Sequence, residues 1–201
     1  LDDAENSLQR YLEVATEREH PLTLLGDLDR QRGKFAAAAD DYREALAVNR
    51  EFTTARLGMA QVEAIMGNTE AAKTLWRDIV GDAGIIPDDR IFAAFDLSSI
   101  LRSEGLFDEA EQPLLQLGKE LHEEKVREAM AYSTRATLHL EMGDFDTAAQ
   151  LIDVALERNV YSPTRYLFAR GLVEIARGDA PELRTTVAEI RTHALPAEDP
   201  D

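Results

Sequence analysis

Five glycines divide this chain into segments of nearly equal length. They lie 34, 38, 38 and 35 residues apart in a sequence of 201 residues, at Gly33, Gly67, Gly105, Gly143 and Gly178. Five positions after them the chain has four alanines and a leucine, in the order Ala38, Ala72, Ala110, Ala148 and Leu183. A period of about 20 to 50 residues indicates stacked copies of one supersecondary unit. The repeat therefore points to an array of such units.

Each copy of the repeat has the pattern of a helical hairpin. The glycine can adopt the left-handed conformation that ends a helix. Apolar residues five, nine and twelve positions later recur at helical spacing, as Ala38, Tyr42 and Ala45 do in the first copy. A small residue seven positions before the glycine, here Gly26, lets two helices approach closely. We therefore expect two antiparallel helices in each copy.

Projecting this pattern over the chain predicts eleven helices. We place them at residues 3–18, 20–32, 35–48, 52–66, 69–83, 88–104, 107–122, 125–142, 145–158, 162–177 and 180–194. The first of these is the second half of a unit, so the chain opens halfway through a repeat. The two intervals of 38 residues predict a longer loop near GDAGIIPDDR and longer helices around LGKELHEEKVRE.

Three segments carry the pattern most completely. They are LLGDLDRQRGKFAAAADDYREALAVNR (residues 24–50), TRATLHLEMGDFDTAAQLIDVAL (residues 134–156) and YLFARGLVEIARGD (residues 166–179). They resemble the tetratricopeptide repeat (TPR), a helix–turn–helix unit of 34 residues. The resemblance implies an all-α fold, a right-handed α-solenoid of stacked helix–turn–helix repeats. The family's Trp in the first helix is replaced here by Leu22, Arg56, Ala94, Tyr132 and Leu167.

We predict a single TPR array over residues 1–195. A half repeat covers residues 1–18, and full repeats cover about 19–52, 53–90, 91–128, 129–163 and 164–195. Residues 196–201 are predicted to form a flexible acidic tail.

The chain is strongly acidic, with 22 basic and 39 acidic residues and a formal net charge of −17. Such a surface repels phosphate backbones and anionic lipid heads, so partners of the nucleic-acid and membrane-surface classes are disfavoured. No apolar run approaches the roughly 18 to 20 residues that cross a bilayer. We attribute the net negative charge to the requirement for solubility, and the alternative explanation is a basic binding partner. Residues 158–193 differ, because six arginines outnumber four acidic residues there.

The chain contains no cysteine, which excludes disulfides and cysteine-ligated metals and is compatible with cytoplasm and periplasm alike. The opening LDDAENSLQR lacks a signal-peptide pattern, which favours the cytoplasm, and it lacks a starting Met, which suggests a segment of a longer protein.

We find no motif that carries chemistry. The four histidines, His20, His122, His139 and His193, are scattered, and the zinc-protease, phosphate-loop, dinucleotide and serine-hydrolase motifs are missing. His139 is expected to be an ordinary helix-surface residue. We therefore predict no catalytic residue, no cofactor, no metal site and a function other than that of an enzyme.

The resemblance implies that the first helix of each pair lines a concave groove, which in the family binds peptides or helices of partner proteins. From the inward positions we select a candidate partner-binding groove of Leu57, Gln61, Ile65, Phe92, Phe95, Ser99, Arg102, Met130, Ser133 and Thr137. The same positions of the last copy hold Arg165, Phe168, Leu172, Ile175 and Ala176. Alternatively, Phe92 and Phe95 pack in the core of a lengthened repeat.

The function that we predict is a non-catalytic protein–protein interaction scaffold. It would bind a peptide or helical segment of another protein, apolar or amphipathic or basic, in the groove. The alternative is a regulatory or substrate-recruiting segment of a larger enzyme or signalling protein. Neither end of the array has a capping helix, so either the native chain continues on both sides, which we favour, or these ends meet another molecule, which includes a second copy of the chain.

Overall fold

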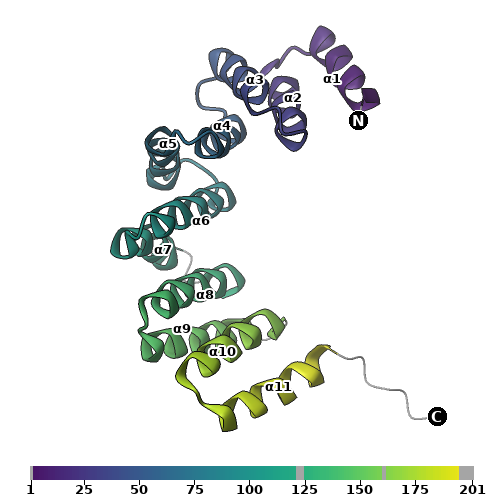
Figure 1. Cartoon of the computed structure of the whole chain (residues 1–201). Coiled ribbons are helices and arrows are strands. Elements are labelled where there is room, and N and C mark those ends of the chain that lie inside the picture. The colour runs from purple at the N-terminus through teal and green to yellow at the C-terminus, as the bar shows by residue number, and fades with distance from the viewer. Residues whose placement is uncertain (1, 121–124, 160–161, 195–201) are drawn as a thin grey trace, which may run out of the picture. The chain divides into compact units, whose positions relative to one another are not determined.

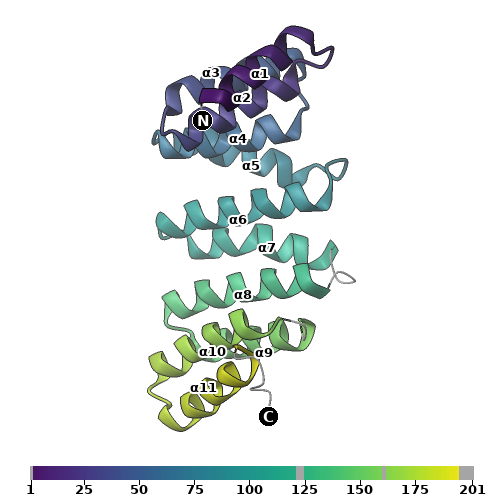
Figure 2. The same ribbon diagram turned by 90° about the vertical axis from the view of Figure 1, so that its right-hand side faces the viewer.

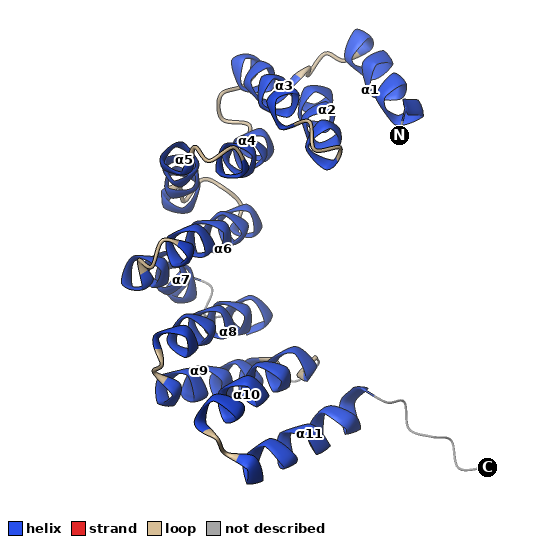
Figure 3. Cartoon of the chain, in the orientation of Figure 1, coloured by secondary structure: helices blue, strands red, loops and turns tan. Residues whose placement is uncertain are grey.

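The computed structural model describes residues 2–120, 125–159 and 162–194, and within these ranges the chain forms eleven helices and no strand (Figures 1 and 3). This confirms the predicted all-α fold. The helices are α1 (Asp2–Val14), α2 (Glu19–Gln31), α3 (Phe35–Val48), α4 (Thr53–Ile65), α5 (Thr69–Gly81), α6 (Pro87–Ser103), α7 (Phe107–Glu120), α8 (Lys125–Met142), α9 (Phe145–Arg158), α10 (Thr164–Arg177) and α11 (Ala180–Ala194).

The helix ends lie within a few residues of their predicted positions, and the largest difference is at α1. This helix ends at Val14, whereas the sequence pattern predicted residue 18. Pro21 explains the break that precedes α2. In one continuous helix the carbonyl of Glu17 would lack a donor at Pro21, whereas in the first turn of a new helix the missing N–H is not needed.

The chain divides into two compact units, Leu1–Ile100 and Leu101–Asp201, and the division falls inside α6. The first unit contains α1 to α5 and most of α6, and the second contains the end of α6 and α7 to α11. The single array over residues 1–195, with its repeat boundaries, stays a prediction. The predicted tail at 196–201 lies outside the described residues.

Within each unit, neighbouring helices pack as hairpins (Figure 2). In the first unit α3 packs against both α2 and α4, and α4 packs against α5. In the second unit α8 packs against α7 and α9, and α10 packs against α9 and α11. The first helices of successive hairpins also contact each other, because α2 touches α4 and α8 touches α10. Each unit therefore presents a surface made of first helices.

The five repeat glycines all adopt the left-handed backbone conformation predicted for them. Their φ angles lie between 71° and 85°. At Gly33 the turn is closed by two backbone bonds, from Gly33 N–H to the Arg30 carbonyl and from Lys34 N–H to the Asp29 carbonyl. These bonds satisfy carbonyls that the end of α2 would otherwise leave open.

The core of the first unit is built around Tyr42. Its side chain is completely buried among small and apolar residues, including Ala38, Ala45 and Val62. Its ring lies against Gly26 of α2 and Gly58 of α4. Gly26 lies seven positions before its turn glycine and Gly58 nine positions before the next one, and the small size of both allows three helices to close around one aromatic ring.

The two intervals of 38 residues are absorbed largely by longer helices. α6 has 17 residues and α8 has 18, whereas α2 and α4 have 13 each. The start of α6 is fixed by Arg90, whose guanidinium is buried and donates two hydrogen bonds, of 3.0 and 2.9 Å, to the carbonyl of Val80 in α5. Arg90 thus supplies donors to a buried carbonyl in the last turn of α5, where helical hydrogen bonding ends.

Candidate protein-binding surfaces

The candidate groove residues of the first unit lie on α4 and α6. Leu57, Gln61 and Ile65 are spaced four residues apart and share one face of α4. Leu57 and Gln61 are half-buried, whereas Ile65 is 53% exposed. These positions therefore form a surface that is apolar at both ends and polar in the middle.

On α6 the structure separates the two phenylalanines. Phe92 is 59% exposed, whereas Phe95 is half-buried and Ser99 is exposed. Phe92 therefore does not pack in the core, as the alternative interpretation of the sequence had it. The buried face of the same helix is made by Ile91, Leu97 and other residues outside the candidate set.

A hydrogen bond joins the inner faces of α4 and α6. Nε2 of Gln61 donates to Oδ2 of Asp96 over 2.9 Å. Burial raises the pKa of the Asp96 carboxyl above its usual range, and the Gln61 bond and the charge of Arg30 partly offset this effect. Asp96 was not among the candidate residues, because the sequence alone does not show which side chains of neighbouring helices meet.

Arg30 belongs to a second polar group on α2. The Tyr42 hydroxyl donates to Oδ1 of Asp27 over 2.7 Å and accepts from Nε of Arg30 over 3.3 Å. Arg30 also forms an ion pair with Asp27. The first unit therefore offers half-buried acceptors and donors along α2, α4 and α6, with exposed apolar side chains beside them.

The remaining candidates lie in the second unit. Arg102 forms an ion pair with Glu141 of α8, with 2.5 Å between Nη1 and Oε1. Met130 and Ser133 are half-buried, and Thr137 is exposed but donates its hydroxyl to the Ser133 carbonyl. Arg102 therefore contributes a neutralised pair to this surface.

The candidate set omitted the most exposed large apolar residues in the described part of the second unit. Phe168, Leu172 and Ile175 of α10 are 59%, 58% and 61% exposed. Their signal was present in the sequence, because they occupy the inward positions of the last repeat. The ten candidate residues, by contrast, all lie on α4, α6 and α8.

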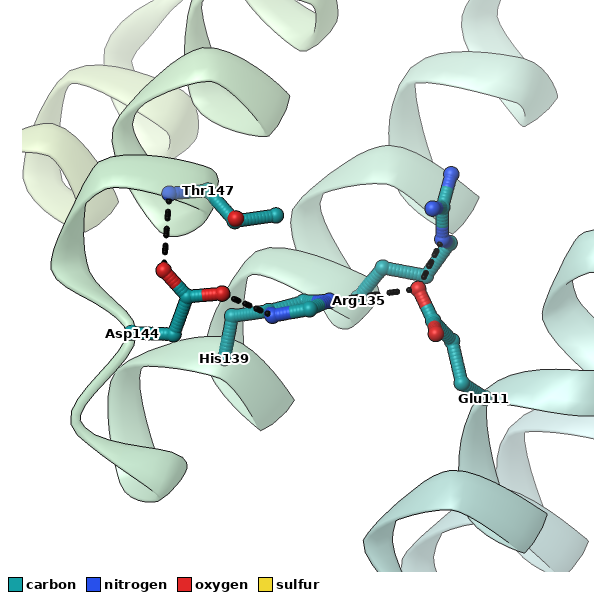
Figure 4. Close-up of polar contacts among 5 residues, drawn as sticks. All are labelled: Glu111, Arg135, His139, Asp144 and Thr147. Carbon is teal, nitrogen blue, oxygen red and sulfur yellow. Dashed lines mark hydrogen bonds and ion pairs between the residues drawn. The ribbon is translucent and has the colours of Figure 1, made fainter.

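His139 is not the ordinary helix-surface residue that the sequence predicted. Its half-buried ring lies between two carboxylates, with Nδ1 3.1 Å from Asp144 and Nε2 3.3 Å from Glu111 (Figure 4). Arg135 also donates to Glu111, over 2.7 Å, and Asp144 accepts from the Thr147 N–H at the start of α9. This chain of bonds ties α7, α8 and α9 together.

Protonation of the two carboxylates would weaken that chain, because it removes the negative charges that face Arg135 and His139. Burial raises the pKa of Glu111, but its bonds and charge interactions with Arg135 and His139 outweigh burial and leave the pKa below its usual range. The bonds from Thr147, together with His139, lower the pKa of Asp144. In the described part of the chain, no group of three or more His, Cys, Asp or Glu residues is arranged to hold a metal ion.

A family profile of the tetratricopeptide repeat matches residues 23–75 and 133–184, just over half of the chain. The chain belongs to the tetratricopeptide repeat family. The unmatched middle, residues 76–132, contains α6 and α7 and lies within the two longer intervals between Gly67 and Gly143. A search of curated proteins found no match.

Solved TPR structures share the fold of the chain. The structure of BtubC (BKLC) from P. vanneervenii is similar over 100% of this chain and 91% of its own, with a TM-score of 0.79 and 19% identity. A tetratricopeptide repeat protein from Parabacteroides merdae covers 96% of this chain and 73% of its own, with a TM-score of 0.70 and 18% identity. YrrB, a TPR protein described as having an unusual peptide-binding site, covers 92% and 91%, with a TM-score of 0.59 and 15% identity.

These similarities place the chain among the TPR solenoids and confirm the predicted fold class. TPR proteins generally mediate protein–protein interactions. Across the described residues, every helix is too short or too polar to traverse a lipid bilayer.

Proposed function

We propose that this TPR protein is a non-catalytic interaction module that binds a peptide or helical segment of another protein on the inner faces of α4 and α6. The observation that carries the proposal is the exposure of Phe92, 59%, beside the hydrogen-bonded pair Gln61 and Asp96. An aromatic side chain that a partner can cover is the typical anchor of a protein interface. Leu57 and Ile65 extend the apolar area on α4.

The polar side chains of Gln61 and Asp96 would fix the orientation of a bound segment. Gln61 uses its amide N–H on Asp96, which leaves its carbonyl oxygen to accept from a partner's backbone N–H. Asp96 can accept from a donor or pair with a cation of the partner. An apolar segment with a basic residue would therefore fit both the anchors and the acidic character of the chain.

In the second unit, we propose that Met130, Ser133 and Thr137 take part in partner binding together with Arg102. Because Arg102 is already paired with Glu141, it would contribute hydrogen bonds to a partner and not an unpaired positive charge. The peptide-binding site named for YrrB supports a partner of the peptide class, because the two proteins share the TPR fold.

The test is a selection of peptides from a display library on the full chain, followed by measurement of their dissociation constants. Phe92→Ala and Gln61→Ala should each weaken the peptides that use the first unit, Phe92→Ala by about tenfold or more. Phe168→Ala is the matched control, because this residue has the same exposure in the other unit. The proposal is wrong if none of the selected peptides loses affinity with Phe92→Ala or Gln61→Ala.

A further inference from the structure

The inner face of α10 carries a continuous apolar row. Phe168, Leu172 and Ile175 follow one another at spacings of four and three residues, so they lie on one face of the helix. Each is more than half exposed, whereas Tyr166, Leu167 and Val173 of the same helix are almost completely buried. The row is therefore separate from the core-facing side of α10. Contiguous exposed apolar side chains mark interaction sites.

A single cation continues this row. Arg165 lies three residues before Phe168 on the same face and is exposed, and it has no ion-pair or hydrogen-bonding partner among the described residues. The other arginines of α10 are engaged, because Arg170 binds Glu189 and Arg177 binds Asp146. The row thus ends in an available positive charge.

No carboxylate of α10 competes for Arg165. The only acidic residue of this helix is Glu174, which is buried and accepts a hydrogen bond of 2.8 Å from the Thr186 hydroxyl of α11. The segment 158–193 has two more arginines than acidic residues, in a chain whose net charge is −17. Two of these arginines, Arg158 and Arg177, pair with Glu128 and Asp146 outside the segment, so the positive charge available at the row is that of Arg165, which favours an acidic group on the partner.

The dimensions of the row suit a helix. It runs from Phe168 to Ile175, about 10 Å along α10 at a rise of 1.5 Å per residue. Rows of this spacing pack into the grooves between side chains of another helix. α8 contacts α10, and Met130 and Leu140 of α8 are half-buried.

We propose that the α10 row is a docking surface for an amphipathic helix of another protein, one whose apolar row is followed by a carboxylate that pairs with Arg165. The proposal rests on the chain being an interaction module, but it uses a different surface and a different recognition chemistry from α4 and α6.

The probe is a set of three synthetic peptides of about 20 residues, long enough to form a helix on binding. The first has leucines at spacings of three and four with a glutamate one turn before and one turn after them. The second has lysines in place of these glutamates, and the third has the composition of the first in scrambled order. Fluorescence anisotropy with the full chain should rank the affinities first, second, third, with the difference between the first two shrinking in high salt.

Two matched pairs of variants locate the binding. Phe168→Ala should weaken the first peptide about tenfold or more, whereas Phe92→Ala, with equal exposure, should leave it unchanged. Ile175→Ser should weaken it, whereas Ile86→Ser, also 61% exposed, should not. Arg165→Ala should weaken the first peptide severalfold and should remove its advantage over the second. Circular dichroism of each variant checks that the helices are retained.

Three results would overturn the proposal. The scrambled peptide could bind as tightly as the first, or Phe92→Ala could weaken the first peptide as much as Phe168→Ala. Sedimentation could instead show a dimer that Phe168→Ala dissociates, which would assign the row to a second copy of the chain. If Phe92→Ala weakens the first peptide and Phe168→Ala does not, the proposed function stands and only the α10 surface is rejected.

Discussion

The ring of Tyr42 fills the space that a side chain on Gly58 would need. A Cβ built on Gly26 would lie 2.7 Å from Cε1 of Tyr42, and one built on Gly58 would lie closer still. Both glycines are buried, so the ring has no open space into which it can move. Gly26, Tyr42 and Gly58 come from α2, α3 and α4, and their contact sets how closely these three helices approach.

Gly58→Ala is therefore expected to destabilise the first unit, because the added methyl group forces the helices apart. The cost should be about 1 to 3 kcal/mol, measured by urea denaturation. Gly118→Ala in α7 is the control, since a Cβ there would meet no atom within 4 Å. That change should be neutral or should stabilise by up to about 1 kcal/mol, because glycine disfavours a helix. Equal effects of the two substitutions would contradict this account of the core.

Asp41 gives a prediction for pH dependence. Burial and the nearby carboxylates of Asp29, Glu44, Asp40 and Glu5 raise its pKa from 3.8 to about 6. The folded chain therefore binds this proton more tightly than the unfolded chain, and the resulting stability is present below the unfolded pKa and lost as pH rises through about 6. Asp41→Asn, which is always neutral, should raise the unfolding midpoint near pH 7.5, and the gain should shrink near pH 5. A gain that is the same at both pH values, or a similar gain from Asp40→Asn, would contradict the assignment.

Glu111→Gln tests the bonds around His139. The amide keeps the shape of the carboxylate but loses its charge opposite Arg135 and His139, so the second unit should lose about 1 to 2 kcal/mol at neutral pH. Because the pKa of Glu111 is lowered in the folded chain, its contribution is present above the usual value of 4.5 and is lost as pH falls through the folded pKa. Urea denaturation should therefore show the two proteins converging in acid. Glu157→Gln, an exposed change on α9, should have no effect at either pH.

Arg90→Met tests the link between α5 and α6. Methionine fills part of the same buried volume but cannot donate to the Val80 carbonyl, so we expect a loss of about 2 kcal/mol. Arg50→Met is the control, because Arg50 is exposed and has no partner among the described residues. A thermal midpoint unchanged by Arg90→Met would show that the Val80 carbonyl finds another donor.

Phe92→Ala tests whether Phe92 lies on the surface of α6 or contributes to the core. Phe92 is largely exposed, so its removal should change stability by less than about 0.5 kcal/mol. Leu97→Ala, on the buried face of the same helix, should cost about 2 to 5 kcal/mol because it leaves a cavity. A large loss of thermal stability with Phe92→Ala would remove Phe92 from the candidate groove.

The periodicity of the sequence was sufficient to predict the helices, because the requirements of the hairpin are local. A glycine that must adopt a positive φ, and apolar residues at helical spacing, are visible without knowledge of distant residues. The links between helices were not predictable in this way. The bonds from Gln61 to Asp96 and from Arg90 to Val80 depend on helix register and on side-chain rotamers, which the pattern of apolar residues leaves open.

The same limit applies to the candidate groove. Phe92 and Phe95 both occupy inward positions in the repeat, yet one is exposed and the other is half-buried, because a rotation of α6 by a few tens of degrees decides between them. Position within a repeat therefore selects a helix face, and packing against the neighbouring helices selects the residues on that face that a partner can reach.

The bonds that join successive repeats connect residues close in sequence. Gln61 and Asp96 are 35 residues apart, and Arg102 and Glu141 are 39 apart. A chain held together by such short-range links can nucleate at any hairpin and add its neighbours one at a time, with no need to bring distant segments together first. Refolding of this chain should therefore be fast for its length.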